Sequence, residues 1–334
     1  MSINSPAPSR LRAYSRFIVA VIWFILARGL ARGRSLRIAH EPLAPLVDQA
    51  ILAVFLLLGY TAMGYVLDRE PHPVSAQGWP RREGWTGEAG VGLAVGWALA
   101  VACVLPMVVG GGIAIVVVLG YSAWLWLAAD IAFFALAALA EEIAFRGYGF
   151  QRFVDAVGPL GAALGFAAFY AIVQAMMPGS SRVSISVSVV LSLLLTLVYL
   201  RTRALWMSWG INFAWKASRA LIFGLTVSGV NSHSPVVQGN PMGPFWLTGG
   251  GFGLDGSWVA LLALLIALPV VYRLTRELDY KYNAPVIVPG GIAVDISAAA
   301  RVQHETAMGS TAEPAPGLVQ IAPVASVEKP PAVG

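Results

Sequence analysis

Long apolar segments recur along this chain, and they constrain its fold more than any other feature of the sequence. A helix that crosses the hydrocarbon core of a bilayer needs about 20 mostly apolar residues. Such segments lie at about residues 49–67, 90–110, 121–147, 159–177, 184–200, 204–223 and 258–274. Gly and Pro residues separate them. The sequence therefore predicts an all-α protein, a polytopic integral membrane helix bundle of about seven or eight transmembrane helices.

The composition excludes a water-soluble globule. Hydrophobic residues make up 57% of the chain and charged residues only 12%, whereas soluble domains have about 25% charged residues. The net charge is +5, and the basic residues fall mainly in loops and flanks. The expected partner is therefore the lipid bilayer with its anionic surface, and no nucleic acid. The single cysteine, Cys103, excludes an intrachain disulfide and a metal site built from cysteines.

Four regions follow from the distribution of apolar and polar residues. We predict a disordered N-terminus at residues 1–15, a basic segment with a short apolar stretch at 16–48, the transmembrane bundle at 49–279, and a disordered Pro/Ala-rich tail at 280–334. The short stretch at 17–27 has arginines on both sides. It is either an uncleaved signal-like segment or an interfacial helix, and we favour the interfacial helix.

The distribution of arginines between loops predicts the orientation of the bundle. From residue 68 onward the arginines share one side of the predicted topology, and the opposite loops carry only Arg182. The positive-inside rule then places the C-terminal tail in the cytoplasm. The arginine-rich segment 28–37 falls on the other side if 49–67 is one simple crossing. The rule therefore leaves the topology of the N-terminal region open.

A charged cluster closes the apolar segment 121–147 at residues 140–148 (AEEIAFRGY). Glu142 and Arg146 are four residues apart, so they share one helix face with the acid in the favourable N-terminal position. Glu141 points about 100° away and is free to face another group. This arrangement suits a general base beside a structural ion pair. The alternative is a charged collar in water where the helix ends at the bilayer edge.

Other polar residues lie within the apolar segments, where each is costly and so a candidate for function. Asp130 is in the middle of its segment and needs a partner or a water-filled cavity. Gln174 shares a face with Phe166 and Tyr170 at a spacing of four residues. A second polar face consists of Trp209, Asn212, Lys216 and Arg219. Gln174 and Asn212 could equally be hydrogen-bonding residues between helices, but Lys216 is a charge near mid-span.

Four blocks of this sequence, in this order, resemble the CPBP family, the type II CAAX prenyl endopeptidases and their bacteriocin-processing relatives. The first block is the Glu141, Glu142 and Arg146 cluster. The others are residues 158–179 (GPLGAALGFAAFYAIVQAMMPG), 205–216 (LWMSWGINFAWK) and 249–257 (GGGFGLDGS). The resemblance covers roughly residues 80–276, and the order and spacing of the four blocks make it specific.

Membership of this family implies an intramembrane, glutamate-dependent metalloendopeptidase that uses zinc. The resemblance implies that Glu141 is the catalytic base, with Glu142 and Arg146 as its supporting pair. The histidine of the family's second motif falls on Gln174. The histidine of the third motif falls on Asn212, and its asparagine falls on Lys216.

These departures weaken the expectation of a metal. The four histidines of the chain, His40, His72, His233 and His304, all lie in predicted loops or tails. Zinc prefers histidine nitrogen or cysteine sulfur, so we expect no metal ligands and no cofactor. Two acids, Glu141 and Glu142, balance two bases, Arg146 and Lys216, without a metal. The sequence therefore predicts an ion pair between Glu141 and Lys216 in place of a metal site.

Three functions remain open. The family resemblance implies a CAAX-type intramembrane endopeptidase, which could use Gln174 and Asn212 as donors to an oxyanion. The second is a catalytically inactive family member that acts as a membrane peptide-binding or scaffold protein. The third is an ion or proton transporter that uses the same charges together with Asp130. The expected location is a bacterial plasma membrane, and the expected substrate or ligand is a hydrophobic or prenylated peptide.

Overall fold

The computed structural model describes residues 9–39, 42–231, 234, 236–283, 286–288 and 292–294. The chain divides into two compact parts, one of residues 5–282 and one of residues 1–4 with 283–334. In the second part, strands β3 (Val286–Val288) and β4 (Ile292–Val294) pair antiparallel. They lie within residues 280–334, the predicted disordered tail. The rest of the predicted disordered tail after residue 283, and residues 1–8, lie outside the described residues.

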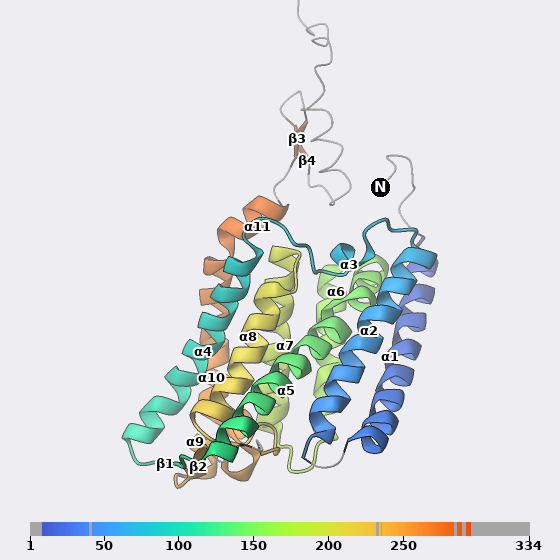
Figure 1. The fold of residues 1–334 in the computed structure, drawn as a ribbon. Helices are drawn as coiled ribbons and strands as arrows, with labels where there is room; N and C mark the ends of the chain where they lie inside the picture. The colour runs from blue at the N-terminus through green and yellow to red at the C-terminus, as the bar shows by residue number, and fades with distance from the viewer. Residues whose placement is uncertain are drawn as a thin grey trace, which may run out of the picture. The chain divides into compact units, whose positions relative to one another are not determined.

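Helices make up the larger part (Figure 1). They are α1 (Arg10–Ile38), α2 (Ala44–Leu67), α3 (Pro73–Ala76), α4 (Trp85–Val109), α5 (Tyr121–Arg146), α6 (Tyr148–Ala175), α7 (Arg182–Thr202), α8 (Trp206–Ala217), α9 (Phe245–Thr248), α10 (Trp258–Leu274) and α11 (Arg276–Asn283). Short helical turns complete the set: η1 (Ser218–Ile222), η2 (Gly250–Phe252) and η3 (Leu254–Gly256).

The long helices have the length and composition of membrane spans. Five segments qualify within the described residues, namely Arg10–Ile38, Ala44–Leu67, Trp85–Val109, Tyr121–Ala175 and Arg182–Thr202. The fourth of these holds both α5 and α6, which meet at Gly147. Helix α10 is apolar but shorter. The lengths and apolar composition of these helices confirm the prediction of an all-α integral membrane bundle.

Helix α1 is longer than the sequence predicts. The apolar stretch 17–27 lies within one continuous helix that begins after Ser9, whose side chain caps it. Residues 10–15, predicted to be disordered, are therefore helical. The reason is that arginine is a good helix former, so the basic flanks continue the helix. Its small buried residues, among them Ala20 and Ala27, allow α1 to pack closely against α2 and α6.

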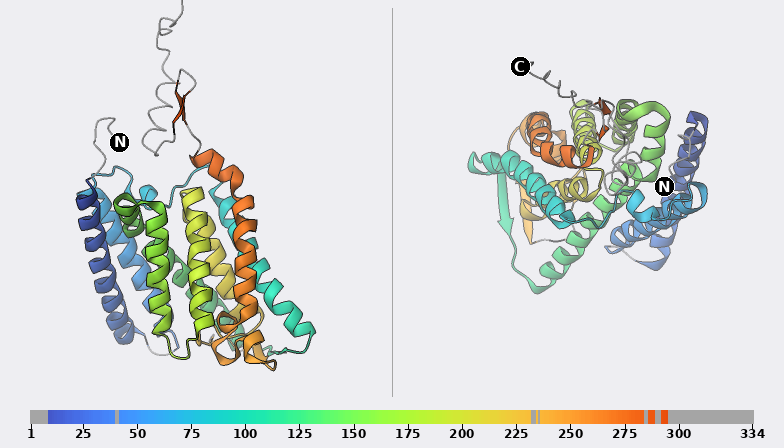
Figure 2. Two further views of the ribbon diagram at one scale, coloured as in Figure 1. Left: turned by 180° about the vertical axis from the view of Figure 1, so that it is seen from behind. Right: turned by 90° about the horizontal axis from the view of Figure 1, so that it is seen from above.

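Two apolar cores hold the bundle together. One is built from α4, α7, α8 and α10 and surrounds Trp215, whose side chain is fully buried. The other is built from α1, α2, α5 and α6. Figure 2 shows α1 and α2 at one edge of the bundle and α4 and α10 at the opposite edge. Helices α5 and α8 make contact between these two groups, and they carry most of the predicted site residues.

The loops at one end contain strands that the all-α prediction missed. Strand β1 (Ile113–Val117) pairs antiparallel with β2 (Val237–Pro241), with Ile115 opposite Gly239. Five of the six residues 113–118 are β-branched, and they follow three glycines; β-branched residues favour strands. The Gly-rich stretch 224–257, between two of the predicted apolar segments, contains β2, α9 and two short helical turns.

Two predicted helices depart from a simple rod. Helix α6 is interrupted at Gly158, which adopts a positive φ of 85° directly before Pro159. The predicted segment 204–223 is helix α8 followed by the π-helical turn η1. A π turn adds a residue to the helical repeat, so it changes which side chains after Ala217 face the bundle interior.

Candidate functional site

The C-terminal end of α5 carries a buried ion pair. Arg146 donates a hydrogen bond to Glu142 Oε1 at 2.8 Å, and the two side chains are 2% and 0% exposed. The pair is therefore inside the bundle and is not a collar in water. Arg146 also donates to the carbonyl oxygen of Ser192 on α7, at 3.3 Å. The predicted contact between residues 142 and 146 is present, and it ties α5 to α7.

Glu141 faces helix α8, on a different side of α5. The ammonium of Lys216 lies 2.5 Å from Glu141 Oε1. The amide nitrogen of Asn212, one turn earlier on α8, donates to Glu141 Oε2 at 3.1 Å and to Glu142 Oε1 at 3.0 Å. The predicted ion pair between Glu141 and Lys216 is thus present, and Asn212 bridges the two carboxylates.

Helix α6 supplies the third wall of this cluster. The hydroxyl of Tyr170 lies 3.5 Å from Glu141 Oε2. Gln174 follows one turn later and is buried, but the structure gives it no hydrogen bond to Glu141. Its Nε2 atom is one of several buried polar atoms that have no partner within the described residues, together with Asn212 Oδ1 and Glu142 Oε2. Gln174 is therefore the one predicted site residue outside the hydrogen-bonded network.

The charges of the cluster balance inside the bundle. Two carboxylates, Glu141 and Glu142, each contact one cation, Lys216 and Arg146 respectively. An unpaired charge in a low-dielectric interior is very costly, so both pairs must stay together. Glu141 is the more accessible acid, with 31% of its side chain exposed against 0% for Glu142. The cluster therefore has one structural carboxylate and one that a ligand can reach.

Two polar residues noted in the sequence have partners elsewhere. Asp130 accepts a hydrogen bond from the backbone nitrogen of Ser234 at 2.7 Å. Arg219 is buried in η1 and pairs with Asp255 at 2.5 Å, and its guanidinium lies over the Trp215 ring. Neither residue is joined to Glu141 by a hydrogen bond in the structure.

The sequence reasoning did not identify Tyr170 or Asp255 as functional candidates. Tyr170 was placed on the correct face of its helix, and the signal was its spacing of four residues from Gln174. Asp255 lies in the Gly-rich turn, and an acid among glycines was the only signal available. Its contact with Arg219 fixes this turn against the helix that carries Lys216.

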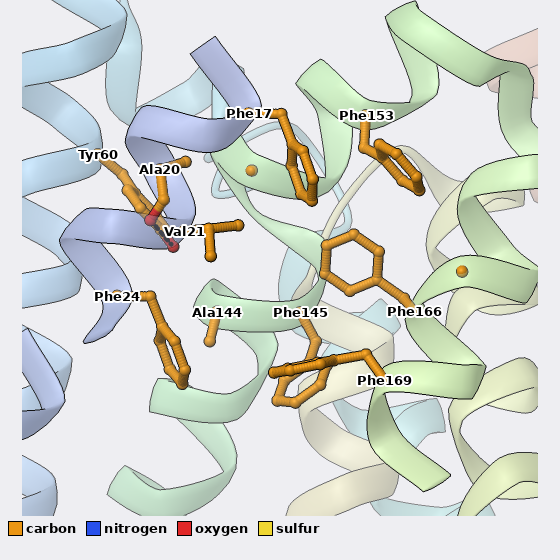
Figure 3. Close-up of a pocket in the computed structure, with 12 residues that line it drawn as sticks. Phe17, Ala20, Val21, Phe24, Tyr60, Ala144, Phe145, Phe153, Phe166 and Phe169 are labelled. Carbon is orange, nitrogen blue, oxygen red and sulfur yellow. Dashed lines mark hydrogen bonds between the residues drawn. The ribbon is translucent and has the colours of Figure 1, made fainter. Parts of the chain in front are cut away.

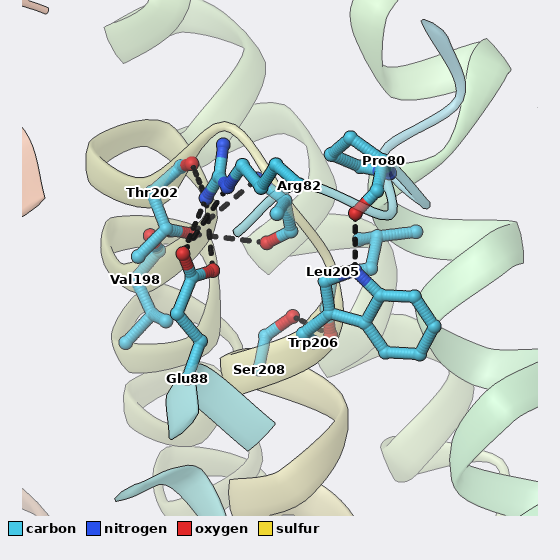
Figure 4. A network of polar contacts seen from close by, with 9 residues as sticks. Pro80, Arg82, Glu88, Val198, Thr202, Leu205, Trp206 and Ser208 are labelled. Carbon is cyan, nitrogen blue, oxygen red and sulfur yellow. Dashed lines mark hydrogen bonds and ion pairs between the residues drawn. The ribbon is translucent and has the colours of Figure 1, made fainter. Parts of the chain in front are cut away.

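A second polar network fixes the start of α8. Figure 4 shows Arg82 beside Glu88, which it contacts at 2.8 Å, and beside the carbonyl oxygen of Thr202 at 2.6 Å. The indole of Trp206 donates to the carbonyl oxygen of Pro80 at 2.9 Å. These bonds join the loop before α4 to the end of α7 and the start of α8, so they set the position of Asn212 and Lys216.

The donor set around Glu141 does not fit zinc. Within the described ranges no group of three His, Cys, Asp or Glu side chains could hold a metal ion. The available groups are two carboxylates already paired with cations, an amide and an ammonium. Zinc takes nitrogen from histidine or sulfur from cysteine in most sites, with carboxylate oxygen as a further ligand. An ammonium at 2.5 Å from the accessible carboxylate also repels a cation.

The fold and the cluster define a class, that of membrane-embedded helical bundles with a carboxylate site between the helices. Residues 122–218 match the family model described as type II CAAX prenyl endopeptidase Rce1-like. This match confirms the predicted resemblance to the CPBP family over that region. It includes the blocks around Glu141, Gln174 and Asn212 but not the Gly-rich block 249–257. No curated protein and no solved structure matches the chain.

Proposed function

We propose that this protein has kept the membrane fold of the CAAX endopeptidase family and binds hydrophobic peptides without metal-dependent hydrolysis. The observation that supports this is the contact of Lys216 with Glu141 at 2.5 Å. The ammonium supplies the positive charge that a metal would otherwise bring to the carboxylate. The ligand we propose is a hydrophobic or prenylated peptide that enters from the bilayer.

Catalytic use of Glu141 as a base would require an oxygen that is free to accept a proton from water. Its Oε1 atom already contacts Lys216, and its Oε2 atom accepts from Asn212. Both oxygens are therefore engaged before any ligand arrives. This arrangement favours binding over hydrolysis.

A slow, metal-independent endopeptidase is the second candidate, and the exposure of Glu141 favours it. In this mechanism Glu141 accepts a proton from the water that attacks the peptide carbonyl, and passes it to the leaving amine nitrogen when the C–N bond breaks. The unpartnered Nε2 of Gln174 and the amide of Asn212 donate to the oxyanion. Lys216 would have to leave Oε1 as the proton is transferred.

We also propose that the protein lies in a bacterial plasma membrane with seven or eight crossings. Helices α2, α4, α5, α6, α7 and α10 each provide one crossing, α8 with η1 provides another, and α1 is the eighth. The C-terminal tail is then cytoplasmic under the positive-inside rule.

The purified protein tests this proposal through its zinc content, peptide binding and peptide cleavage. We expect far less than one zinc per chain, binding of a fluorescent prenylated peptide, and no cleavage that depends on Glu141. Glu141→Ala tests the site, and Glu83→Ala, on an exposed residue, is its matched control. Stoichiometric zinc, or cleavage that Glu141→Ala abolishes and Glu83→Ala does not, would overturn the proposal. Absence of peptide binding would also reject it.

A further inference from the structure

An apolar cavity of about 260 Å³ lies between α1, α5 and α6. Phenylalanine side chains dominate its lining, as Figure 3 shows: Phe17, Phe24, Phe145, Phe153, Phe166 and Phe169. The volume is below the ~300–1,000 Å³ of pockets for drug-sized ligands. The cavity therefore suits a slender apolar chain better than a bulky ring system.

Small residues create this space. Ala20, Ala144, Gly149 and Gly165 also line the cavity, and a larger side chain at any of them would take up part of the volume. Gly165 has a second role, because a Cβ atom there would lie 2.8 Å from the ring of Phe153. The cavity thus depends on small residues contributed by three different helices.

The cavity opens toward the surface that faces lipid. Val21 on α1 and Phe169 on α6 both line it, and they are 38% and 43% exposed. Their neighbours Ile18, Ile25 and Leu164 are exposed as well. Exposed apolar side chains on membrane-spanning helices contact acyl chains, so the nearest available occupant is the bilayer itself.

Unbalanced positive charge lies near one end of this cavity. Arg16 and Arg152 are paired with Asp68, and Arg152 also contacts Asp155 at 3.2 Å. These four charges cancel. Arg10 lies two helical turns before Phe17 on the same face of α1.

Arg10 and Arg12 are both exposed, and the structure gives neither an ion-pair partner among the described residues. Arg10 is on the face of α1 that carries the cavity-lining Phe17, whereas Arg12 is about 140° away on another face. An exposed arginine at the membrane surface attracts anionic lipid.

We propose that this cavity binds one acyl chain of an anionic phospholipid whose phosphate contacts Arg10. The apolar lining binds the acyl chain, and Arg10 favours a headgroup with a net negative charge. Neither Glu141 nor Lys216 lines this cavity, and the proposal does not depend on the function proposed for their cluster.

Native mass spectrometry of the full chain in detergent tests the proposal. The probes are dioleoyl phosphatidylglycerol, dioleoyl phosphatidylcholine with the same chains, and the isoprenoid alcohol farnesol. We expect one phosphatidylglycerol per chain that is retained more strongly than phosphatidylcholine. Ala144→Phe, which fills the cavity, should weaken both lipids by roughly tenfold or more. Ala128→Phe, on an exposed position of the same helix, should leave both unchanged.

A second variant and its control test the contact between α1 and the lipid headgroup. Arg10→Gln, which removes one positive charge, should lower phosphatidylglycerol binding by roughly fivefold. It should lower phosphatidylcholine binding less, because the choline cation of that lipid already offsets its phosphate. Arg34→Gln, at the other end of α1, is the control. Equal binding of the two lipids by the wild type, equal effects of Ala144→Phe and Ala128→Phe, or tighter binding of farnesol than of either lipid would overturn the proposal. A well-folded Val21→Phe variant that also loses lipid would support it if Ala144→Phe fails to fold.

Discussion

At the scale of single residues, the buried pair of Glu142 and Arg146 gives the sharpest stability prediction. Arg146→Met leaves the Glu142 carboxylate buried without its cation, so we expect a loss of about 3–5 kcal/mol in the free energy of unfolding. The double variant Glu142→Gln with Arg146→Met should lose clearly less, because no charge remains unpaired. Reversible unfolding in mixed micelles measures both. Arg182→Met, on an exposed residue, is the control and should change little.

A double variant as unstable as Arg146→Met alone would show that packing, and not charge pairing, holds this end of α5.

The residue scale is also where the sequence was most informative about the site. The family resemblance together with charge balance grouped Glu141 with Lys216 and Asn212, whereas helical spacing relates only residues of one helix. The position of Gln174 outside the network could not be predicted, because hydrogen bonding at an angstrom scale depends on how α6 is rotated.

At the scale of elements, glycines govern the contact between α4 and α8. A Cβ atom at Gly96 would lie 2.4 Å from the carbonyl oxygen of Ile211, whereas one at Gly90 would meet nothing within 4 Å. Gly96→Ala should therefore force the helices apart and cost about 1–3 kcal/mol. Gly90→Ala should instead stabilise α4 by roughly 0.5–1 kcal/mol, because alanine is the better helix former. Unfolding of the two variants in the same micelles should show opposite signs, and equal signs would contradict the close contact.

Most helices could be predicted because their apolar segments are long and are bounded by Gly and Pro. Helix α10 has the predicted limits, and α5 ends one residue before its predicted limit. The pairing of β1 with β2 could not be predicted, because the two strands are far apart in sequence and β2 contains Gly and Pro. The full length of α1 could not be predicted, because its arginines resemble the flanks of a short interfacial segment.

At the scale of the whole molecule, the path of α1 decides the topology. Its apolar stretch between Arg16 and Arg28 is only about 18 Å long at 1.5 Å per residue, well short of the ~30 Å hydrocarbon core. Both arginines have acidic partners on or beside α2, Asp68 for Arg16 and Asp48 for Arg28. Paired in this way, the arginines can lie near the edges of the membrane while α1 crosses it.

Cysteine labelling in intact cells tests whether α1 crosses. The background is Cys103→Ser, because the native thiol is the single cysteine of the chain. If α1 crosses, Gly33→Cys should react with a membrane-impermeant maleimide from outside, as Arg182→Cys does on the same side of the bundle. Arg81→Cys should react only after the cells are permeabilised, since the positive-inside rule places the arginine-rich side in the cytoplasm. If Gly33→Cys is protected in intact cells while Arg182→Cys is labelled, α1 is an interfacial helix and the bundle has one crossing fewer.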